Sequence, residues 1–149
     1  MKPGDPAPAF TLPDEDGNER SLKTFLDDGP VVLFFYPAAM TTGCTAESCH
    51  FRDLAAEFAA LGAQRVGISV DPVGKQKEFS SKNSFDYPLL SDEDGAVARS
   101  FDVKRRFGPL PVKRTTFVIS TDGRILDVIS NEFKMAVHAD RALETLRKQ

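Results

Sequence analysis

Apolar runs in the sequence mark the strands and helices of the expected core. Residues 31–35 are all apolar and partly β-branched, which predicts a strand buried on both faces of a sheet and ended by Pro37. Downstream, apolar residues recur at helical spacing and predict one helix over about 43–61, with one face on the sheet and a stop at Gly62. The residues of that face are Phe51, Leu54, Ala55, Phe58 and Leu61.

The rest of the pattern alternates strands with helices. Turn signals at Asp16-Gly17 and Thr121-Asp122-Gly123 predict two hairpins, which pair residues 10–12 with 19–22 and residues 116–120 with 124–129. The other predicted elements are strands at 65–70 and 87–90 and helices at 22–26, 74–83, 96–101 and 136–147. Strand, helix and strand in succession imply parallel pairing. We therefore predict an α/β fold, a central mixed sheet flanked by helices with an N-terminal hairpin extension.

Length and composition are those of an ordinary globular protein. We expect one domain over residues 1–149, with 41% hydrophobic and 28% charged residues. A net charge of -3 gives no electrostatic reason to expect nucleic acid or an anionic membrane as a partner. The amino terminus lacks the apolar run of a signal peptide, and no segment approaches the roughly 20 apolar residues of a membrane span. We expect a cytoplasmic protein, where paired cysteines are more often catalytic or metal-binding than structural.

Both cysteines lie where the long predicted helix begins. Cys44 precedes Phe51 by about two turns, so it heads the buried face in the first turn, where unpaired amides and the helix dipole favour a thiolate. Cys49 lies about 8.7 Å from Cys44 in an ideal helix, Cα to Cα, whereas a disulfide spans at most about 7 Å. Bonding of the two sulfurs would require the first turns to unwind, which suits a redox cycle. Two helical cysteines without chemistry remain the alternative on these local facts.

The surroundings of Cys44 form a recognisable motif. Pro37-x-x-x-Thr41-x-x-Cys44 resembles the peroxiredoxin active-site motif, and the spacing of Cys44 and Cys49 resembles the peroxiredoxin Q (bacterioferritin comigratory protein) branch. Arg114, ahead of a predicted strand, resembles the arginine of that family's second motif. The resemblance implies a thioredoxin-like fold and a thiol-dependent peroxidase of the atypical 2-Cys type. Its substrates would be hydrogen peroxide and organic hydroperoxides.

The resemblance also implies a role for each site residue. The Cys44 thiolate would attack the peroxide, which Thr41 and Arg114 hold in line, while Pro37 shields the pocket from water. The remaining site residues, behind these, would be Glu47, which orients Arg114, and Tyr36 at the strand end. An ionised thiol alone gains at most about 30-fold over an ordinary cysteine at neutral pH. Most of the acceleration must therefore come from positioned donors, each worth on the order of 10²–10³.

The same resemblance implies how the enzyme is recycled. Cys49 would resolve the sulfenic acid formed at Cys44 as an intramolecular disulfide, which thioredoxin or a similar dithiol donor would reduce. No metal or organic cofactor is implied, and we expect a monomer or a weak homodimer. Members often carry proline where this chain has Thr42, so the rigidity of this loop is left open.

Several other patterns favour unremarkable interpretations. Asp14, Asp16 and Asn18 alternate as in a calcium loop, but Glu19 stands where glycine is needed, so we expect a solvated turn. The basic cluster at 104–114 is short and is expected to form a solvated loop rather than a nucleic-acid contact. A zinc site has no recognised spacing, and we expect both histidines on helix surfaces. Its candidate ligands would be Cys44, Cys49, His50 and His138.

Three other functions differ from the peroxiredoxin hypothesis in testable ways. A glutathione-peroxidase-like enzyme would use a tryptophan, and this chain has none. A thiol–disulfide oxidoreductase would use a Cys-x-x-Cys pair, which is also missing. A redox-sensing binding module would react once with peroxide and stop, whereas a peroxidase turns over.

Overall fold

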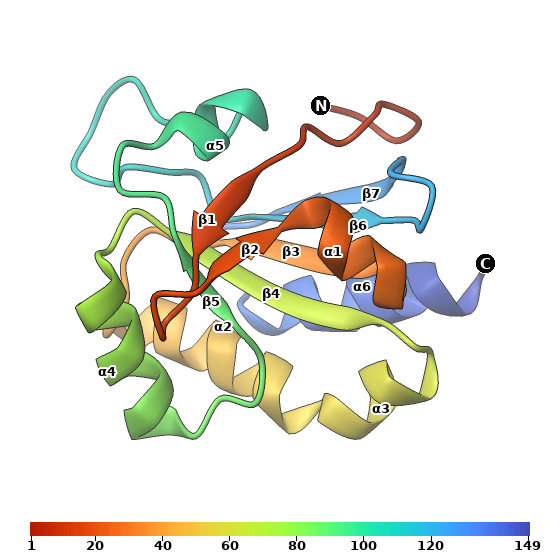
Figure 1. Ribbon diagram of the computed structural model, residues 1–149, viewed down its shortest axis with the longest axis horizontal. Coiled ribbons are helices and arrows are strands. Elements are labelled where there is room, and N and C mark those ends of the chain that lie inside the picture. Colours follow the sequence, from red (N-terminus) through yellow and green to blue (C-terminus); the bar gives the residue numbers. More distant parts are fainter.

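A five-stranded sheet with the strand order β5-β4-β3-β6-β7 forms the centre of the computed structural model, which describes residues 1–149 (Figure 1). β3 pairs in parallel with β4, which pairs in parallel with β5, while β6 lies antiparallel to both β3 and β7. The sheet is therefore mixed, as predicted. Its strands are β3 (Val31–Phe35), β4 (Gln64–Ser69), β5 (Leu89–Ser91), β6 (Thr115–Ile119) and β7 (Ile125–Ser130).

Helices cover both faces of this sheet (Figure 1). On one face lie α2 (Thr42–Asp53), α3 (Ala55–Ala60), α4 (Val73–Asn83) and α6 (Ala136–Arg147). On the other face lie α1 (Leu22–Asp28), α5 (Ala96–Ser100) and the N-terminal hairpin of β1 (Thr11–Pro13) and β2 (Glu19–Ser21). The predicted α/β architecture, including the hairpin extension, is confirmed. No helix is long and apolar enough to cross a membrane.

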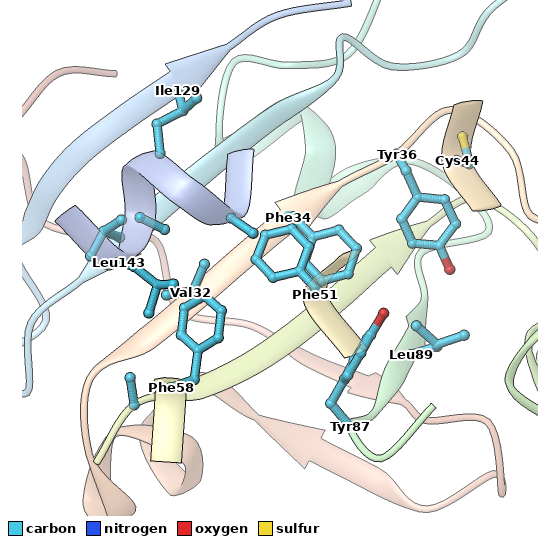
Figure 2. Packing of buried hydrophobic residues seen from close by; sticks show 14 of the residues in the cluster. Val32, Phe34, Tyr36, Cys44, Phe51, Phe58, Tyr87, Leu89, Ile129 and Leu143 are labelled. Atoms are coloured by element: carbon cyan, nitrogen blue, oxygen red, sulfur yellow. The ribbon is translucent and has the colours of Figure 1, made fainter. Parts of the chain in front are cut away.

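The side chains of β3 divide between two cores. Val32 and Phe34 point into the core beneath α2, α3, α4 and α6. Val31, Leu33 and Phe35 point into the core on the hairpin side. Phe34 stacks on Phe51 of α2 with ring centroids 4.2 Å apart (Figure 2). Aromatic pairs of this kind add to the burial energy. This contact fixes α2 on the sheet and so fixes the position of its first turn, which carries Cys44.

One local expectation was wrong. The predicted single helix over 43–61 is interrupted at Leu54, whose ψ of 21° divides it into α2 and α3, although Phe51 and Phe58 on either side both remain fully buried. In the turn after β1, residues 16–19 are exposed, as expected for a solvated turn. Asp14 is 3% exposed because its carboxylate accepts bonds from the amides of Asp16 and Asn18 and from Arg20.

Candidate active site

Cys44 lies past the carboxyl end of the central strand β3, in the first turn of α2. Its side chain is 1% exposed, because α2 presents the same face to the sheet at Cys44 as at Phe51. The antiparallel strand β6 begins where β3 ends, with Thr115 opposite Phe35. Arg114, the residue before β6, therefore reaches the edge of the sheet at which Cys44 lies.

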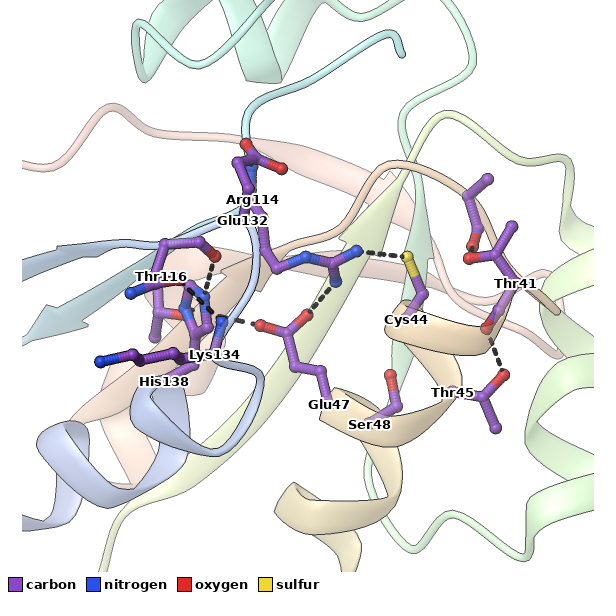
Figure 3. Close-up of polar contacts among 12 residues, drawn as sticks. Thr41, Cys44, Thr45, Glu47, Ser48, Arg114, Thr116, Glu132, Lys134 and His138 are labelled. Atoms are coloured by element: carbon purple, nitrogen blue, oxygen red, sulfur yellow. Dashed lines mark hydrogen bonds and ion pairs between the residues drawn. The ribbon is translucent and has the colours of Figure 1, made fainter.

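The guanidinium of Arg114 lies between the cysteine and a buried carboxyl group. Its Nη2 donates to Cys44 Sγ at 3.2 Å, and its Nη1 donates to Glu47 Oε1 at 2.9 Å (Figure 3). Arg114 is 6% exposed and Glu47 is fully buried. Two charge-assisted hydrogen bonds in a site that excludes water hold the guanidinium in one orientation against the sulfur.

Two residues that the sequence did not single out position Arg114. The carboxylate of Glu132 accepts a hydrogen bond from the Arg114 amide at 2.9 Å and pairs with Arg105 at 2.9 Å. Gly43 leaves the space that the guanidinium occupies, since a Cβ there would lie 3.3 Å from Arg114 Nη2. Neither role has a local sequence signal, because each depends on a contact between distant segments.

Behind Arg114, Glu47 faces a histidine. Its Oε2 lies 3.5 Å from Nδ1 of His138, which is itself 2.7 Å from Thr116 Oγ1, while His138 Nε2 lies 2.8 Å from the carbonyl oxygen of Asn131. Burial raises the pKa of Glu47 to about 8, although Arg114 opposes this shift. Burial also disfavours the charged form of His138 and so lowers its pKa. The expectation of a surface histidine was wrong for His138, which is fully buried.

The loop between β3 and α2 is held by an aspartate that follows β4. Asp71 Oδ2 accepts the amide of Ala39 at 2.7 Å and the hydroxyl of Ser69 at 2.7 Å. Met40, next along the loop, has a φ of 71°, a conformation that a residue with a side chain rarely adopts unless its surroundings impose it. The sequence does contain an indication of this role, since Asp71 is an acidic residue shortly after a strand that ends at this edge of the sheet.

Three further motif residues surround the loop. Pro37 is buried directly after the strand end. Thr41 is exposed, and its hydroxyl donates to the carbonyl oxygen of Ala38 at 2.8 Å rather than capping α2. Tyr36 is fully buried, but its hydroxyl points away from Cys44 and donates to Gln76 Oε1 at 2.5 Å (Figure 2). Tyr36 thus contributes its ring to the core that also contains Cys44, and its hydroxyl bonds elsewhere.

Cys49 is on the same helix as Cys44, and both thiols are free. Cys49 is half-buried, with its Sγ 3.7 Å from Asn83 Oδ1 of α4. Both cysteines lie in the unbroken run of α2, so they cannot bond without a change in the helix.

The comparisons with known proteins agree with this geometry. The profile of the AhpC/TSA family matches residues 3–128. The chain belongs to the AhpC/TSA family. It is 64% identical to peroxidoxin BcpB from Mycobacterium tuberculosis, whose crystal structure superposes with a TM-score of 0.95 over 99% of this chain and 97% of that one.

Other relatives belong to the peroxiredoxin Q branch. The chloroplastic peroxiredoxin Q of Suaeda salsa is 41% identical over 97% of this chain and 67% of its own length. A bacterioferritin comigratory protein of Xanthomonas campestris, described as having alkyl peroxide reduction activity, is 34% identical, with a TM-score of 0.85 over 93% of this chain and 90% of that one. Membership of this family supports a thiol peroxidase that uses peroxide substrates and a thiol reductant.

The peroxiredoxin site has no arrangement suited to a metal ion. Both ring nitrogens of His138 already face protein oxygens, and Nε2 of His50 lies 2.7 Å from Oδ1 of Asp140 in α6. The three clustered carboxylates at 14–16 lie in the distant hairpin turn. There the Asp14 carboxylate already accepts hydrogen bonds from a backbone amide and from Arg20. What the site does offer is a buried sulfur beside a fixed cation.

Proposed function

We propose that this chain reduces hydrogen peroxide and organic hydroperoxides with Cys44 as the nucleophile. The thiolate attacks the terminal peroxide oxygen, the O–O bond breaks, and the products are a sulfenic acid on Cys44 and an alkoxide or hydroxide that takes a proton to become alcohol or water. The observation that carries the proposal is the hydrogen bond from Arg114 Nη2 to Cys44 Sγ at 3.2 Å. It places a fixed cation where negative charge moves from sulfur to the leaving oxygen.

Thr41 and Pro37 complete the proposed peroxide pocket. The Thr41 hydroxyl already donates its proton to Ala38, so its oxygen is available to accept the O–H of a hydroperoxide. Buried Pro37 offers no N–H and limits access of water to the sulfur. Glu47 supports the site indirectly, by holding Nη1 of Arg114.

Cys49 is proposed to resolve the sulfenic acid within the same chain. Its thiolate would attack the Cys44 sulfur and expel the sulfenic hydroxyl as hydroxide, which takes a proton to become water. The product is the Cys44–Cys49 disulfide, which a dithiol donor such as thioredoxin would then reduce. The beginning of α2 suits this step because its N-cap, Thr41, makes no side-chain capping bond. A missing cap weakens the first turn by about 0.5–2 kcal/mol. Unwinding there would bring the two sulfurs together.

Several further properties follow from this proposal. With both cysteines on one chain, catalysis needs no partner subunit, in keeping with a monomer or a weak homodimer. The single domain over 1–149 would hold the complete site of an atypical 2-Cys peroxiredoxin, and free thiols of this kind fit a reducing, cytoplasmic environment. Activity toward alkyl hydroperoxides is proposed because the Xanthomonas campestris relative is described as reducing them.

Substitution of each cysteine in turn distinguishes their two proposed roles. Cys44→Ser is expected to abolish peroxide consumption. Cys49→Ser is expected to form the sulfenic acid and consume one equivalent of peroxide, but to lose thioredoxin-supported turnover. Stopped-flow oxidation followed by mass analysis for the intramolecular disulfide measures both steps. Full turnover by the Cys44 variant would refute the assigned nucleophile, and a single turnover by the unaltered protein with excess reductant would instead indicate a redox sensor.

The arginine is tested in the same assay. Arg114→Ala should slow sulfenic acid formation by at least about tenfold, because it removes one preorganised donor. Arg124→Ala, an exposed arginine on the far hairpin, serves as the control for loss of one positive charge. A rate for the Arg114 variant within about twofold of that control would remove the guanidinium from the mechanism.

A further inference from the structure

Away from Cys44, the surface carries a cavity lined almost entirely by positive charge. It lies between α5 and the loop over 102–113, with a volume of about 500 Å³. We call it the basic cavity. Its cationic lining residues are Arg99, Lys104, Arg105, Arg106 and Lys113.

Four of the five cations of the basic cavity lack the carboxylate partner that most other cations of the chain have; the fifth, Arg105, pairs with Glu132. Eleven of the nineteen lysines and arginines form ion pairs, and four of the remaining eight line this one cavity: Arg99, Lys104, Arg106 and Lys113. The single carboxylate of the lining, Asp102, is bound to the amino group of Met1 at 3.4 Å. On a chain of net charge -3, this concentration of one sign creates a local field that attracts anions.

Much of the backbone that carries these cations is anchored. Lys104 forms an antiparallel bridge with Val112, the Arg105 amide donates to Pro111 at 2.9 Å, and the Lys113 amide donates to Val103 at 2.8 Å. Val103 and Val112 are both buried in the core on this side of the sheet. Lys104, Arg105 and Lys113 therefore project from an anchored backbone, so little ordering of the main chain would be needed when an anion binds.

One aromatic ring completes the basic cavity. Phe107 lines it and is 86% exposed, next to Arg106 at the tip of the hairpin. Arginines and lysines bind phosphates through charge-assisted hydrogen bonds, and exposed aromatic rings stack on nucleobases. The volume falls within the range of small-molecule sites.

We propose that the basic cavity binds a nucleoside diphosphate or triphosphate, with the phosphates among the cations and the base on Phe107. This site is distinct from the peroxidase centre. Glu132 stands between them, since it accepts from Arg105 on the cavity side and from the Arg114 amide on the active-site side. The proposal therefore does not rest on the peroxidase function.

Calorimetric titration with three probes tests the ligand chemistry. ADP and inorganic pyrophosphate are both expected to bind, ADP more tightly, while adenosine is expected not to bind at the same concentrations. Absence of binding by both ADP and pyrophosphate would overturn the proposal. Tighter binding of a short single-stranded oligonucleotide than of ADP would also overturn it, because the surface would then be a nucleic-acid contact.

Matched variants locate the site. The double variant Arg106→Gln/Lys113→Gln should weaken ADP and pyrophosphate by about tenfold or more, since it removes two charged donors. Lys23→Gln/Arg147→Gln removes the same net charge from exposed, unpaired cations elsewhere and should bind as the parent does. Equal weakening in both variants would mean non-specific attraction and would refute the site.

The aromatic contact has its own variant. Phe107→Ser should lower ADP affinity to that of pyrophosphate and leave pyrophosphate binding unchanged. An unchanged preference for ADP would remove the base from the proposal. Peroxide consumption should be unaffected by Arg106→Gln/Lys113→Gln, and a loss of peroxide turnover in this variant would contradict the separation of the two sites.

Discussion

Glu47 is buried between a guanidinium and an imidazole. Its Oε1 accepts from Arg114 at 2.9 Å, and its Oε2 lies 3.5 Å from His138 Nδ1. Because burial raises the pKa of this carboxyl to about 8, the group holds a proton over much of the neutral range. A neutral Glu47 still accepts a hydrogen bond from Arg114 but does not compete for its charge. The arginine charge is then directed to Cys44.

This protonation makes stability depend on pH. The folded state keeps a proton on Glu47 that the unfolded chain loses above about pH 4.5, so the free energy of unfolding should fall as the pH rises toward 8, by at most about 1.4 kcal/mol per pH unit. His138, whose pKa is lowered by burial, adds the opposite slope only below about pH 6.5. Urea unfolding from about pH 7 to 8 therefore isolates Glu47.

The control is made in a Cys44→Ala background, which removes the thiol that contacts Arg114. Adding Glu47→Gln to that variant should flatten the pH dependence, since glutamine cannot ionise. The slope is the readout, because the substitution will also change the absolute stability. The same slope with and without Glu47→Gln would show that this carboxyl is not the titrating group.

At the scale of elements, the beginning of α2 combines weak capping with the proposed catalytic change. Thr42 is the first residue of α2 and is exposed, and Thr41 before it has φ and ψ of -82° and 156°. These angles are the ones favoured before proline, and the first helical position tolerates proline. The loop is thus shaped for a proline that this chain does not carry.

Thr42→Pro should therefore stabilise the reduced protein by about 0.4–1 kcal/mol, because proline restricts the unfolded chain. The same stiffening should slow disulfide formation with Cys49, which requires the first turn to unwind, while leaving sulfenic acid formation unchanged. Urea unfolding and rapid-quench mass analysis measure the two effects. Faster disulfide formation in a stabilised variant would contradict the unwinding step.

The sequence predicted elements well where burial alone sets the pattern. β3 and α6 have the predicted bounds, and the apolar stripe placed Cys44 on the buried face of α2. The sequence predicted contacts poorly, because the periodicity of apolar residues indicates that a side chain is buried but not which residues it contacts. His138 lies one turn before Ala142 on the packed face of α6, yet only the fold brings it to Glu47.

The same limit applies to the site. The proximity of Arg114 to Cys44 was expected only from the family resemblance, since no local rule connects residues so far apart. Asp71 and Glu132 have no place in the motif, and their roles depend on where β4 and β7 end at the sheet edge. The interruption at Leu54 was also missed, because Phe51 and Phe58 keep the helical spacing across it.

At the scale of the whole molecule, close packing on the sheet supports the site from below. Gly67, in the middle of β4, has no room for a side chain: a Cβ there would lie 2.8 Å from Leu89 Cδ2, 3.0 Å from Phe34 Cζ and 3.2 Å from Tyr36 Cε1. These neighbours belong to the core that carries α2. Overpacking at Gly67 would therefore be transmitted to the helix above.

Gly67→Ala should lower the free energy of unfolding by about 1–3 kcal/mol through this overpacking. Gly74→Ala is the matched control, because Gly74 lies in the exposed first turn of α4 with nothing near its Cβ. It should raise stability by about 0.5–1 kcal/mol, since alanine is the better helix former. Urea unfolding compares the two, and a stabilised Gly67 variant would mean that the core relaxes around the added methyl.

The junction of β3 with β6 also bears on how the enzyme is made. Arg114 follows Cys44 by 70 residues, so a ribosome that has translated only the first 113 residues has produced the thiol without its guanidinium. Under the proposed mechanism, the sulfur of such an unfinished chain lacks the donor that speeds its reaction with peroxide. The proposed mechanism therefore implies that a nascent chain reacts with peroxide more slowly than the folded protein, in which Arg114 has reached Cys44.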